Sequence, residues 1–429
     1  MLKKSFFIFS SKLASIVLGL ILNVVISRAL GVEDRGAFAV LLLVPAILSI
    51  LFRGGAEVSI IHYLKINKDL KTKIFSNSIY LSIFLSIISI VVFSIVNHFF
   101  KPAALEKINP DLIKLAAWLT PFEIIYIYIS MTFLGIDNFK MYNVSNVITP
   151  IINAIILIIV TFNGKINLHT ALYTYFLTYI VRLLITIYNL PADLKIPTMP
   201  DKNILKNLLS YGVKGYIGNV FDFLILRFDM FIVTTMLGLK ATGIYSIAII
   251  CERILIIPDS FALATITSQE NYDDIQGVLN ACNNLNILMS TITVMGILCS
   301  KMFFTIVFGK VFSEAWQPFS ILMIGYYFLS VTKPIKTYIT VKSGTPQISS
   351  YGSALALITN IIIIYILVPI WGMNGAAIST TISNLVYSAT LVYYFSKKTG
   401  ISPLKLLSPK KENFLELKAK FLNLKLKRA

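Results

Sequence analysis

Charged side chains inside long apolar runs are the residues of this sequence whose types and spacing best suit chemistry. Each charge at the centre of a bilayer costs about 2.5–3.5 kcal/mol on insertion scales, so such residues are expected to face a protein interior or a hydrated cavity. There, arginine and lysine can hold an anion such as a phosphate group through charge-assisted hydrogen bonds. The basic residues within apolar runs are Arg53, Arg182, Lys214, Arg227, Arg253, Lys333 and Lys336.

Acidic residues in the same runs offer a second kind of chemistry. A buried carboxylate can exchange a proton or hold Na⁺, and it can also neutralise a neighbouring cation. Arg53 and Glu57 are four residues apart and can pair on one helix. Arg227 can pair with Asp229 or Glu252 and thereby tie two segments together. The acids within apolar runs are Glu57, Glu123, Asp222, Asp229, Glu252 and Asp259.

Arg182 and Lys333 are the strongest candidates for binding an anion, because neither has an acidic residue within one turn of its own helix. At 100° per residue, Tyr175 and Tyr179 lie on the same helix face as Arg182, and Tyr326 lies on the face of Lys333. These tyrosines can contact a polar ligand, and they can equally pack one helix against another. The acids and cations within the runs nearly balance, so a strongly cationic cavity remains a hypothesis.

The elements that must position these residues are membrane-spanning helices. Hydrophobic residues make up 56% of the 429-residue chain and charged residues 14%. Apolar runs of about 20 residues, the length that crosses the hydrocarbon core, recur throughout, and they are too continuous for the alternating strands of a barrel. The sequence therefore predicts an all-α polytopic membrane protein. Twelve spans are expected, at 6–27, 36–61, 75–97, 112–134, 142–162, 168–190, 208–236, 243–267, 282–307, 316–341, 347–370 and 375–395.

An internal repeat divides the predicted helices into two halves. The segment from Leu30-Gly31 through Gly36-Ala37-Phe38 returns as Leu237-Gly238 through Gly243-Ile244-Tyr245, at an offset of 207 residues. Asn153 and Asn360 open a second pair of similar apolar segments at the same offset. Internal repeats of this kind are common among transporters. We expect two pseudo-symmetric six-helix bundles at 1–196 and 197–396, followed by a basic amphipathic tail at 397–429.

The net charge of +18 comes from lysine and arginine residues in short connectors and in the tail. That pattern orients a membrane protein and does not indicate nucleic-acid binding. It predicts that both termini lie in the cytoplasm, and membrane lipid is an expected partner of the tail, either as an interfacial helix or as a frayed basic segment. The cysteines lack metal-ligand spacing, so no metal site is expected.

Four motifs make the sequence resemble the Wzx-type polysaccharide (O-unit) flippases of the multidrug/oligosaccharidyl-lipid/polysaccharide exporter superfamily. Two of them are the copies of the repeated segment, and a third is Arg227-Phe228-Asp229 just before the second copy. The fourth, Pro369 through Ala377 (PIWGMNGAA), lies between the last two predicted spans. Each motif is short, and their order and spacing carry a resemblance that covers nearly the whole chain.

The resemblance implies two helix bundles around a central cavity, and a transport function without enzymatic activity. The implied cargo is an undecaprenyl-diphosphate-linked oligosaccharide, which alternating access would carry across the bacterial cytoplasmic (inner) membrane for surface polysaccharide such as O-antigen or capsule. Cavity cations would hold the diphosphate, and tyrosine and asparagine side chains would contact the glycan. The implied substrate-binding cations are Arg53, Arg182, Lys214, Arg253, Lys333 and Lys336. The glycan-contact candidates are Tyr175, Tyr179, Tyr326 and Asn146.

No cofactor is expected, although coupling to Na⁺ or H⁺ would require a buried carboxylate. The expected partners are the glycan polymerase and chain-length proteins of the same pathway. The candidates for ion coupling are Asp222, Asp229 and Glu252.

Two other functions stay open. A cation-coupled multidrug exporter of the same fold is one, although such exporters often carry a carboxylate in the first span and residues 6–27 contain none. A membrane-embedded glycan polymerase or ligase is the other. Those enzymes usually display a large outer loop with paired basic residues, whereas the longest expected outer connector, 97–111, is short and no acid/base constellation stands out.

Overall fold

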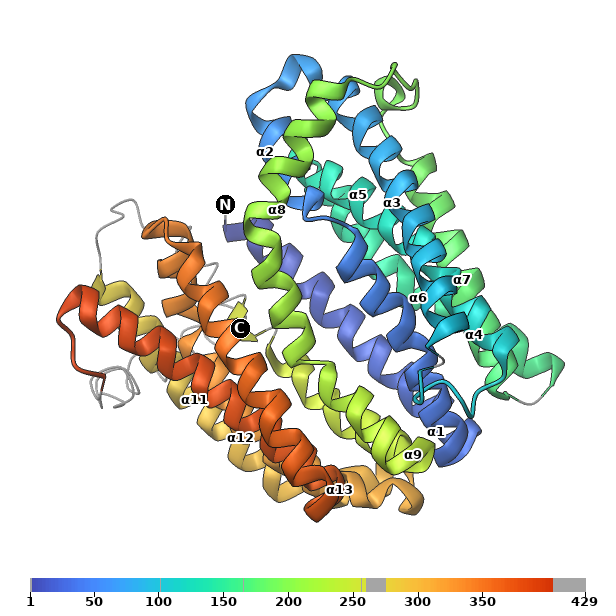
Figure 1. Ribbon diagram of the computed structural model, residues 1–429, viewed down its shortest axis with the longest axis vertical. Helices are drawn as coiled ribbons and strands as arrows, with labels where there is room; N and C mark the ends of the chain where they lie inside the picture. Colours follow the sequence, from blue (N-terminus) through green and yellow to red (C-terminus); the bar gives the residue numbers. More distant parts are fainter. Residues whose placement is uncertain (1, 101, 165, 256, 260–274, 404–429) are drawn as a thin grey trace, which may run out of the picture. The chain divides into compact units, whose positions relative to one another are not determined.

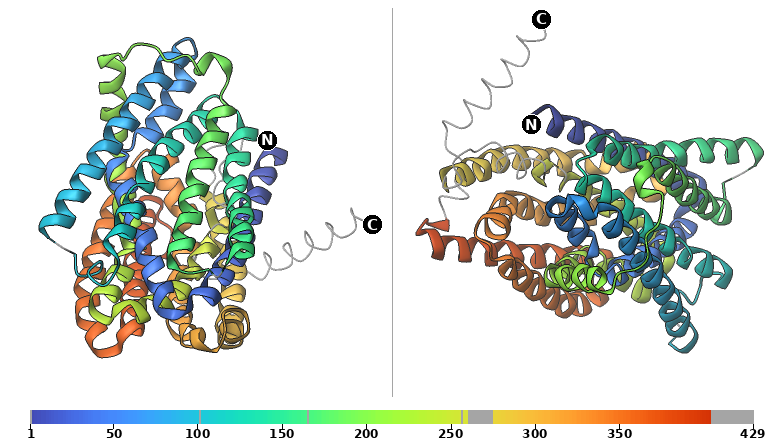
Figure 2. Two further views of the ribbon diagram at one scale, coloured as in Figure 1. Left: turned by 90° about the vertical axis from the view of Figure 1, so that its right-hand side faces the viewer. Right: turned by 90° about the horizontal axis from the view of Figure 1, so that it is seen from above.

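The computed structural model describes residues 2–100, 102–164, 166–255, 257–259 and 275–403. Throughout these ranges the chain forms helices joined by short connectors, and none of the described residues lies in a β-strand (Figures 1 and 2). This confirms the predicted all-α class. Seven of the described helical segments are long and apolar enough to cross a membrane. Of the longest two, α13 holds two of the predicted spans, and α1 holds one span and part of a second. The count of twelve stays a prediction.

The helices of the first half of the chain are α1 (Leu2–Phe52), α2 (Ala56–Ile66), η1 (Lys68–Leu70), α3 (Lys71–Phe99), α4 (Pro110–Ala117), α5 (Leu119–Gly135), α6 (Phe139–Asn163), α7 (Leu168–Tyr188) and η2 (Ala192–Leu194). Those that follow are α8 (Lys202–Ile225), α9 (Phe228–Ala248), η3 (Ile249–Leu255), α11 (Ile275–Phe303), η4 (Phe304–Phe308), η5 (Lys310–Ala315), α12 (Trp316–Thr337), η6 (Tyr338–Lys342) and α13 (Pro346–Thr399). Of the short elements, η4 and η6 are single π-helical turns.

Glycine residues with positive φ bend three of the long helices. Gly31 in α1 (φ 74°, ψ −175°) and Gly238 in α9 (φ 84°, ψ −179°) have nearly the same backbone conformation, which is open essentially to glycine only. They are equivalent positions of the two repeated segments, 207 residues apart. The repeat in the sequence is therefore also a repeat in backbone geometry. The third bend is at Gly372 in α13.

Two of the predicted spans are interrupted in the structure. The span predicted at 36–61 is divided between α1 and α2 at Arg53-Gly54-Gly55, where both glycines adopt positive φ and so end the right-handed helix. The span predicted at 208–236 is divided between α8 and α9 at Leu226-Arg227. Hydropathy does not register either break, because the interrupting residues are short stretches within apolar sequence. Each break places an arginine at a helix terminus.

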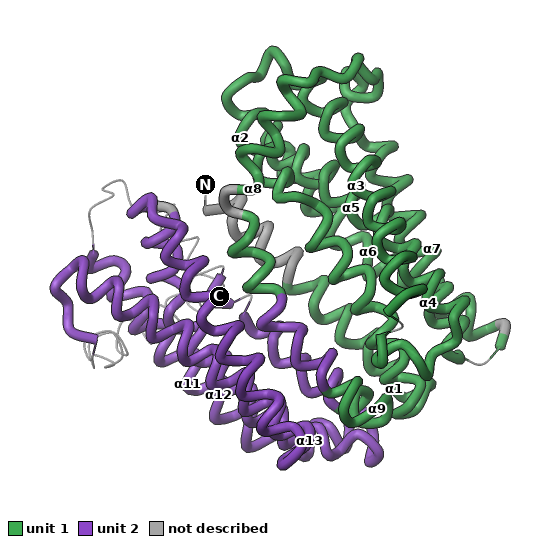
Figure 3. Tube along the Cα trace, viewed as in Figure 1, with its two compact units in different colours: residues 1–223, 233–244 green, residues 224–232, 245–429 purple. Residues whose placement is uncertain are grey.

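The described chain forms two compact units (Figure 3). Unit 1 comprises Met1–Phe223 and Val233–Ile244, and unit 2 comprises Leu224–Ile232 and Tyr245–Ala429. Helix α9 therefore contributes residues to both units. The bundle boundary expected between residues 196 and 197 stays a prediction, and the expected tail lies largely outside the described residues.

Within unit 1, helix α5 packs against α2, α3 and α7. A buried cluster that includes Phe75 of α3, Tyr126 of α5 and Leu183 of α7 joins these helices. Helix α7 begins at Leu168 because Asn167 and Thr170 form a capping box, in which each side chain bonds the other residue's backbone N–H. That cap fixes where the helix starts, and with it the position of Arg182 about four turns further along α7.

Within unit 2, helix α12 packs against both α11 and α13, and the three lie side by side in Figure 1. Hydrogen bonds between helices supplement the apolar packing. Tyr327 of α12 donates to the side-chain oxygen of Asn286 of α11 at 2.5 Å, and Thr381 of α13 donates to the carbonyl oxygen of Ile321 at 2.9 Å. Bonds of this type average about 0.6 kcal/mol in membrane proteins, so they contribute to specificity as much as to stability.

Candidate functional site

Arg182 of α7 is the centre of a polar cluster in the interior of unit 1. Its side chain is 7% exposed and forms an ion pair with Glu123 of α5 through Nη2 and Oε2. The guanidinium carbon lies 3.7 Å from the ring centroid of Tyr126 and 4.4 Å from that of Tyr179. Contacts of a desolvated guanidinium with tyrosine rings contribute about 2 kcal/mol or more. The arginine is therefore held in place by three side chains.

One donor of Arg182 is not satisfied by these contacts. Its Nε is buried and has no hydrogen-bond partner among the described residues. A guanidinium presents its donors in a planar fork, which matches two oxygens of a phosphate or carboxylate. Arg182 is thus flanked by two tyrosine rings and paired with one acid, and its buried Nε lacks a partner among the described residues.

The polar chain around Arg182 extends to α6. The hydroxyl of Tyr126 donates to the side-chain oxygen of Asn146 at 3.3 Å. Sequence reasoning placed Arg182, Tyr179 and Asn146 in a common site, and the structure brings them together through Tyr126, which that reasoning missed. The spacing in the sequence could have indicated Tyr126 in part, because Glu123 and Tyr126 are three residues apart and so share a face of α5.

Arg53 lies at the break between α1 and α2 and is paired within its own segment. Its Nε lies 3.0 Å from Oε1 of Glu57, and the two side chains are 23% and 10% exposed. Tyr128 of α5 donates to the carbonyl oxygen of Arg53 at 2.7 Å and so ties the break to α5. The interpretation of Arg53 and Glu57 as a self-neutralising pair is the one that agrees with this geometry.

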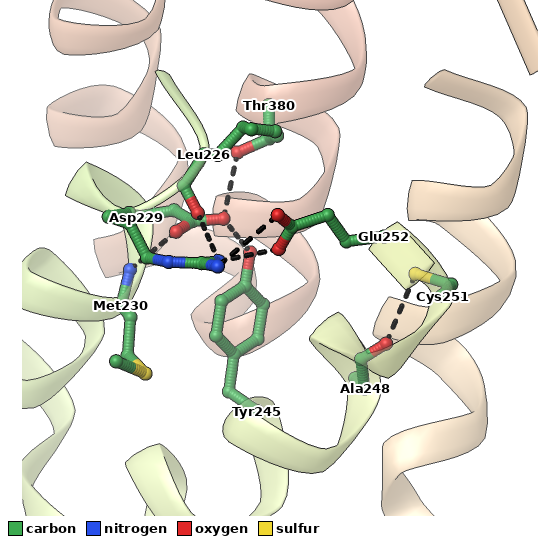
Figure 4. A network of polar contacts seen from close by, with 9 residues as sticks. Leu226, Asp229, Met230, Tyr245, Ala248, Cys251, Glu252 and Thr380 are labelled. Carbon is green, nitrogen blue, oxygen red and sulfur yellow. Dashed lines mark hydrogen bonds and ion pairs between the residues drawn. The ribbon is translucent and has the colours of Figure 1, made fainter. Parts of the chain in front are cut away.

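A second polar network, in unit 2, surrounds the start of α9 (Figure 4). Arg227 donates to both carboxylate oxygens of Glu252, at 2.6 and 3.2 Å, in the bidentate geometry of a strong ion pair. Two residues further on, the carboxylate of Asp229 accepts three hydrogen bonds. The donors are the Tyr245 hydroxyl at 2.6 Å, the Thr380 hydroxyl at 3.1 Å and the backbone N–H of Met230 at 2.7 Å.

The unit 2 network joins three segments that are distant in the sequence. Asp229 is 1% exposed and Tyr245, from the repeated segment, is completely buried. Thr380 belongs to α13, so Asp229 links the start of α9 to the last long helix. The predicted pairing of Arg227 with Asp229 or Glu252 is resolved in favour of Glu252. Tyr245 and Thr380 were not among the predicted site residues.

Lys333 of α12 has an acidic partner from another segment. Its Nζ lies 2.7 Å from Oδ1 of Asp259, whose side chain is 53% exposed. Lys336, one turn away, lies with its Nζ 5.6 Å from the ring centroid of Tyr387. Ion pairs within the described part of the chain thus join an acid to Arg53, Arg182, Arg227 and Lys333, which all come from the apolar runs. The interior charge is thus largely neutralised pairwise.

The remaining predicted site residues are dispersed. Arg253 is exposed in η3, and Asp222 is half-buried in α8. Tyr175 packs edge-on against Phe38, with ring centroids 5.2 Å apart, and Tyr326 is 1% exposed in α12. The side chain of Lys214 lies outside the described residues. No group of three or more potential metal ligands occurs among the residues that the structure describes.

The profile of the polysaccharide biosynthesis protein family matches residues 1–269, well over half of the chain. The chain belongs to this family. A curated relative from Shigella flexneri, named "Putative O-antigen transporter", is 24% identical over 392 residues, which cover 88% of this chain and 93% of the relative.

Solved transporters share the fold. The lipid II flippase MurJ, in an inward closed conformation, superposes with a TM-score of 0.74 at 17% identity, covering 97% of this chain and 92% of the other. An inward-facing multidrug resistance transporter of the MATE family gives a TM-score of 0.66 at 16% identity, covering 92% and 100%. The latter belongs to the MOP superfamily, so this family member has the fold of MOP-superfamily transporters, and its relatives are transporters and flippases rather than enzymes.

Proposed function

We propose that this protein is a flippase for polyprenyl-diphosphate-linked oligosaccharide, of the undecaprenyl type, in surface polysaccharide biosynthesis. The family assignment supports a role in polysaccharide biosynthesis, and the Shigella flexneri relative supports export of an O-antigen unit. The fold shared with a lipid II flippase supports a lipid-linked cargo. The cargo would move by alternating access across the bacterial cytoplasmic membrane, with both termini of the protein in the cytoplasm.

The observation that carries this proposal is the arrangement around Arg182. A diphosphate needs charge-assisted donors in a place from which water is excluded. Arg182 is such a donor, because it is buried, contacts two tyrosine rings and has an unused Nε. Tyr179 beside it carries a hydroxyl group of the kind that sugar hydroxyls bind. The amide of Asn146 is bonded to Tyr126 and to the Tyr142 carbonyl, so a glycan would have to replace one of these bonds.

The ion pair of Arg182 with Glu123 suggests how cargo would bind. The Glu123 carboxylate occupies one side of the guanidinium fork. A diphosphate carries more negative charge than a carboxylate and would compete for the same donors, so binding would exchange one anion for another. Such an exchange keeps the buried cation paired, and the displaced Glu123 carboxylate, whose side chain is 23% exposed, would have to be hydrated or protonated.

The unit 2 network is the proposed site of ion coupling. A carboxylate with hydroxyl neighbours can hold Na⁺ or exchange a proton, and Asp229 has two hydroxyl groups bonded to it. Asp222 and Glu252 are further candidates, although Glu252 is already bonded to Arg227. The glycan polymerase and chain-length proteins of the same pathway are the proposed functional partners.

A second candidate function is export of small cationic drugs. The likeness of the fold to a multidrug transporter favours it. The two candidates differ in the charge that the site must bind, because a drug cation would require an unpaired acid where the flippase requires a cation.

The test is complementation of a strain that lacks the protein, with display of surface glycan as the readout. Arg182→Ala and Lys333→Ala are expected to abolish display while the proteins still accumulate in the membrane. Lys206→Ala removes an exposed lysine from α8 and is expected to leave display unchanged. Normal display in both interior variants would remove these cations from the mechanism, and drug efflux from vesicles containing the purified protein would favour the second candidate.

A further inference from the structure

An apolar groove lies on unit 1 between α3, α5 and α7, and we call it the α3–α5–α7 groove. Its volume is about 370 Å³, and the side chains that line it are mainly aliphatic. Apolar cavities of about 150 Å³ hold a benzene molecule, so this groove can take a considerably longer apolar group. The apolar lining comes from Phe75, Ile79, Ile125, Ile129, Ile187 and Leu190.

The connector between α7 and α8 forms one wall of the groove, through Leu194, Lys195 and Pro197, and is bonded to α3. The backbone N–H of Thr198 donates to the Ser76 hydroxyl at 2.9 Å, and the Tyr80 hydroxyl donates to the Thr198 carbonyl at 3.1 Å. These bonds use the hydroxyl groups of Ser76 and Tyr80, the two α3 residues with polar side chains that line the groove. A molecule bound in the groove would therefore contact mainly apolar side chains, and the connector that forms one wall is held in place.

Two further contacts hold the same connector. The backbone N–H of Asp201 donates to the side-chain oxygen of Asn77 at 2.7 Å, and Lys71 forms an ion pair with Asp193 at 2.5 Å. The wall is therefore attached to α3 at both ends. The groove is a built feature of the fold and does not depend on a single side-chain position.

Lys195 marks the polar end of the groove. Its side chain is exposed, and its Nζ donates to the Tyr188 carbonyl at 2.8 Å while lying 5.3 Å from the ring centroid of that tyrosine. An ammonium group has three donors, and the described contacts direct one of them to a protein acceptor. The others are available to an anion beside the groove.

The end of unit 1 around Lys195 is rich in exposed lysines. Ion pairs and hydrogen bonds connect the segments concerned, which are the start of α3, the α5–α6 connector with the end of α2, and the α7–α8 connector with the start of α8. The acids in these segments are Asp69, Asp137, Asp193 and Asp201. The exposed lysines outnumber them and are Lys65, Lys68, Lys71, Lys73, Lys140, Lys195, Lys202 and Lys206.

We propose that the α3–α5–α7 groove binds one acyl chain of an anionic phospholipid, whose phosphate contacts Lys195. An apolar groove in a membrane helix bundle is filled by a hydrocarbon chain, and clusters of lysines at a helix end select lipids with negative headgroups. The bound lipid packs against the connector wall and holds the lysine-rich end of unit 1 at the membrane surface. This site does not include Arg182, so it is separate from the proposed cargo site.

The test uses the purified full-length protein in a neutral detergent. Phosphatidylglycerol or phosphatidylcholine with the same acyl chains is added, and native mass spectrometry counts the bound lipids while a thermal shift reports stabilisation. We expect tight binding of one phosphatidylglycerol per chain with a higher melting temperature, and weaker binding of phosphatidylcholine. Equal binding of the two lipids would overturn the proposal.

Two pairs of variants locate the site. Ile79→Trp fills the groove and is expected to abolish the tight binding, whereas Ile83→Trp, one turn away on the exposed face of α3, keeps it. Lys195→Gln is expected to weaken binding about fivefold, the loss of about one lysine–lipid contact. Lys107→Gln, which removes an exposed lysine of the α3–α4 connector outside the lysine-rich end, is expected to leave it unchanged. Equal lipid retention by Ile79→Trp and Ile83→Trp would overturn the proposal. Lys195 is exposed, so its variant tests the site even if the tryptophan variants fold poorly.

A polyprenyl phosphate added in competition with phosphatidylglycerol separates this site from cargo binding. We expect phosphatidylglycerol to remain bound at equal concentrations. Preferential binding of the polyprenyl phosphate, lost in Ile79→Trp, would show that the groove belongs to the cargo and would overturn the phospholipid assignment. Because none of these measurements requires transport, their outcome is independent of the proposed function.

Discussion

Gly36 and Gly243 lie in reciprocal contacts between α1 and α9. A β-carbon at Gly36 would lie 1.9 Å from the carbonyl oxygen of Leu239, and a β-carbon at Gly243 would lie 1.9 Å from the carbonyl oxygen of Val32. Both pairs of equivalent residues, Gly36 with Gly243 and Val32 with Leu239, are 207 positions apart. The two copies of the repeated segment therefore pack against each other with local two-fold pseudo-symmetry.

Alanine at either of these glycines is expected to separate the two helices. A distance of 1.9 Å to a backbone atom cannot be relieved by a side-chain rotation, so the backbone must move. Overpacking of this kind costs about 1–3 kcal/mol or more. Gly36→Ala and Gly243→Ala should lower the melting temperature of the purified protein by similar amounts, because the contacts are equivalent.

The matched control for this prediction is Gly164→Ala. A β-carbon at Gly164 has no neighbour within 4 Å, and the backbone there is extended. The melting temperature of Gly164→Ala should equal that of the unsubstituted protein within error. An unchanged melting temperature for Gly36→Ala would contradict the close contact.

A different cost is predicted at the two bends. Gly31 and Gly238 have open space around the missing β-carbon, so the penalty for alanine there comes from backbone conformation and not from a collision. It should be about 1–3 kcal/mol at each position. Asparagine, which tolerates the ordinary left-handed region, should not rescue either position, because ψ is near 180°. Melting temperatures of the alanine and asparagine variants check this, and a rescue by asparagine would contradict the assigned bend.

Stability and transport should respond differently to changes at Arg182 and Glu123. Arg182→Met leaves the Glu123 carboxylate inside the protein without its cation, which is expected to cost about 3–5 kcal/mol. The double variant Arg182→Met/Glu123→Leu replaces the pair with apolar groups and should recover most of that stability. Glycan display should not recover with it, since the double variant lacks the anion-binding group. Recovery of both would assign the pair a structural role only.

The sequence predicted the elements that depend on local pattern. Hydropathy located the helices, and the matching glycines at an offset of 207 residues marked the two equivalent positions, Gly31 and Gly238, at which the helices bend. The contact between the two copies was not predicted. These features are readable because glycine at a position with positive φ is a requirement of the backbone at that residue. The breaks at Arg53 and Arg227 were not predicted, because an interruption of two or three residues does not change the hydropathy of a whole span.

Partners across helices could not be predicted in the same way. Glu123 and Arg182 are 59 residues apart, and a single sequence contains no signal that α5 and α7 are neighbours. The same holds for Asp229 and Thr380, which are 151 residues apart. The similar numbers of acids and cations in the apolar runs predicted that ion pairs could form. Which acid pairs with which cation depends on how the helices pack.

The Asp229 network gives a prediction for ion coupling. Asp229→Asn replaces one acceptor oxygen with an amide group that cannot accept the hydrogen bonds of Tyr245, Thr380 and Met230 together. We expect transport in reconstituted vesicles to lose its dependence on Na⁺ or on a proton gradient, with a modest loss of stability of about 1–3 kcal/mol. Asp222→Asn is the comparison within the same helix pair. If Asp222→Asn removes the cation dependence and Asp229→Asn does not, the coupling site is at Asp222.

The contact of Lys71 with Asp193 predicts a pH dependence of the connector that forms the groove wall. The hydrogen bond from the Lys71 ammonium lowers the pKa of the Asp193 carboxyl below its ordinary value, and the attraction between the two charges acts in the same direction. A carboxyl whose pKa is lowered by folding contributes stability above its unfolded pKa, and that contribution is lost as the pH falls through the lower, folded value. Asp193 is 42% exposed, so the contribution is small.

Asp193→Asn should therefore melt slightly below the unsubstituted protein at pH 7. The difference should shrink as the pH falls below about 4, and it should vanish only below the lowered pKa of the folded protein, where the carboxyl is protonated in both states. Asp69→Asn removes a neighbouring exposed acid and controls for net charge at the same end of unit 1. Phosphatidylglycerol binding to Asp193→Asn measures whether the loosened connector also opens the groove. A difference in melting temperature between Asp193→Asn and the unsubstituted protein that grows as the pH falls would contradict the direction of the shift.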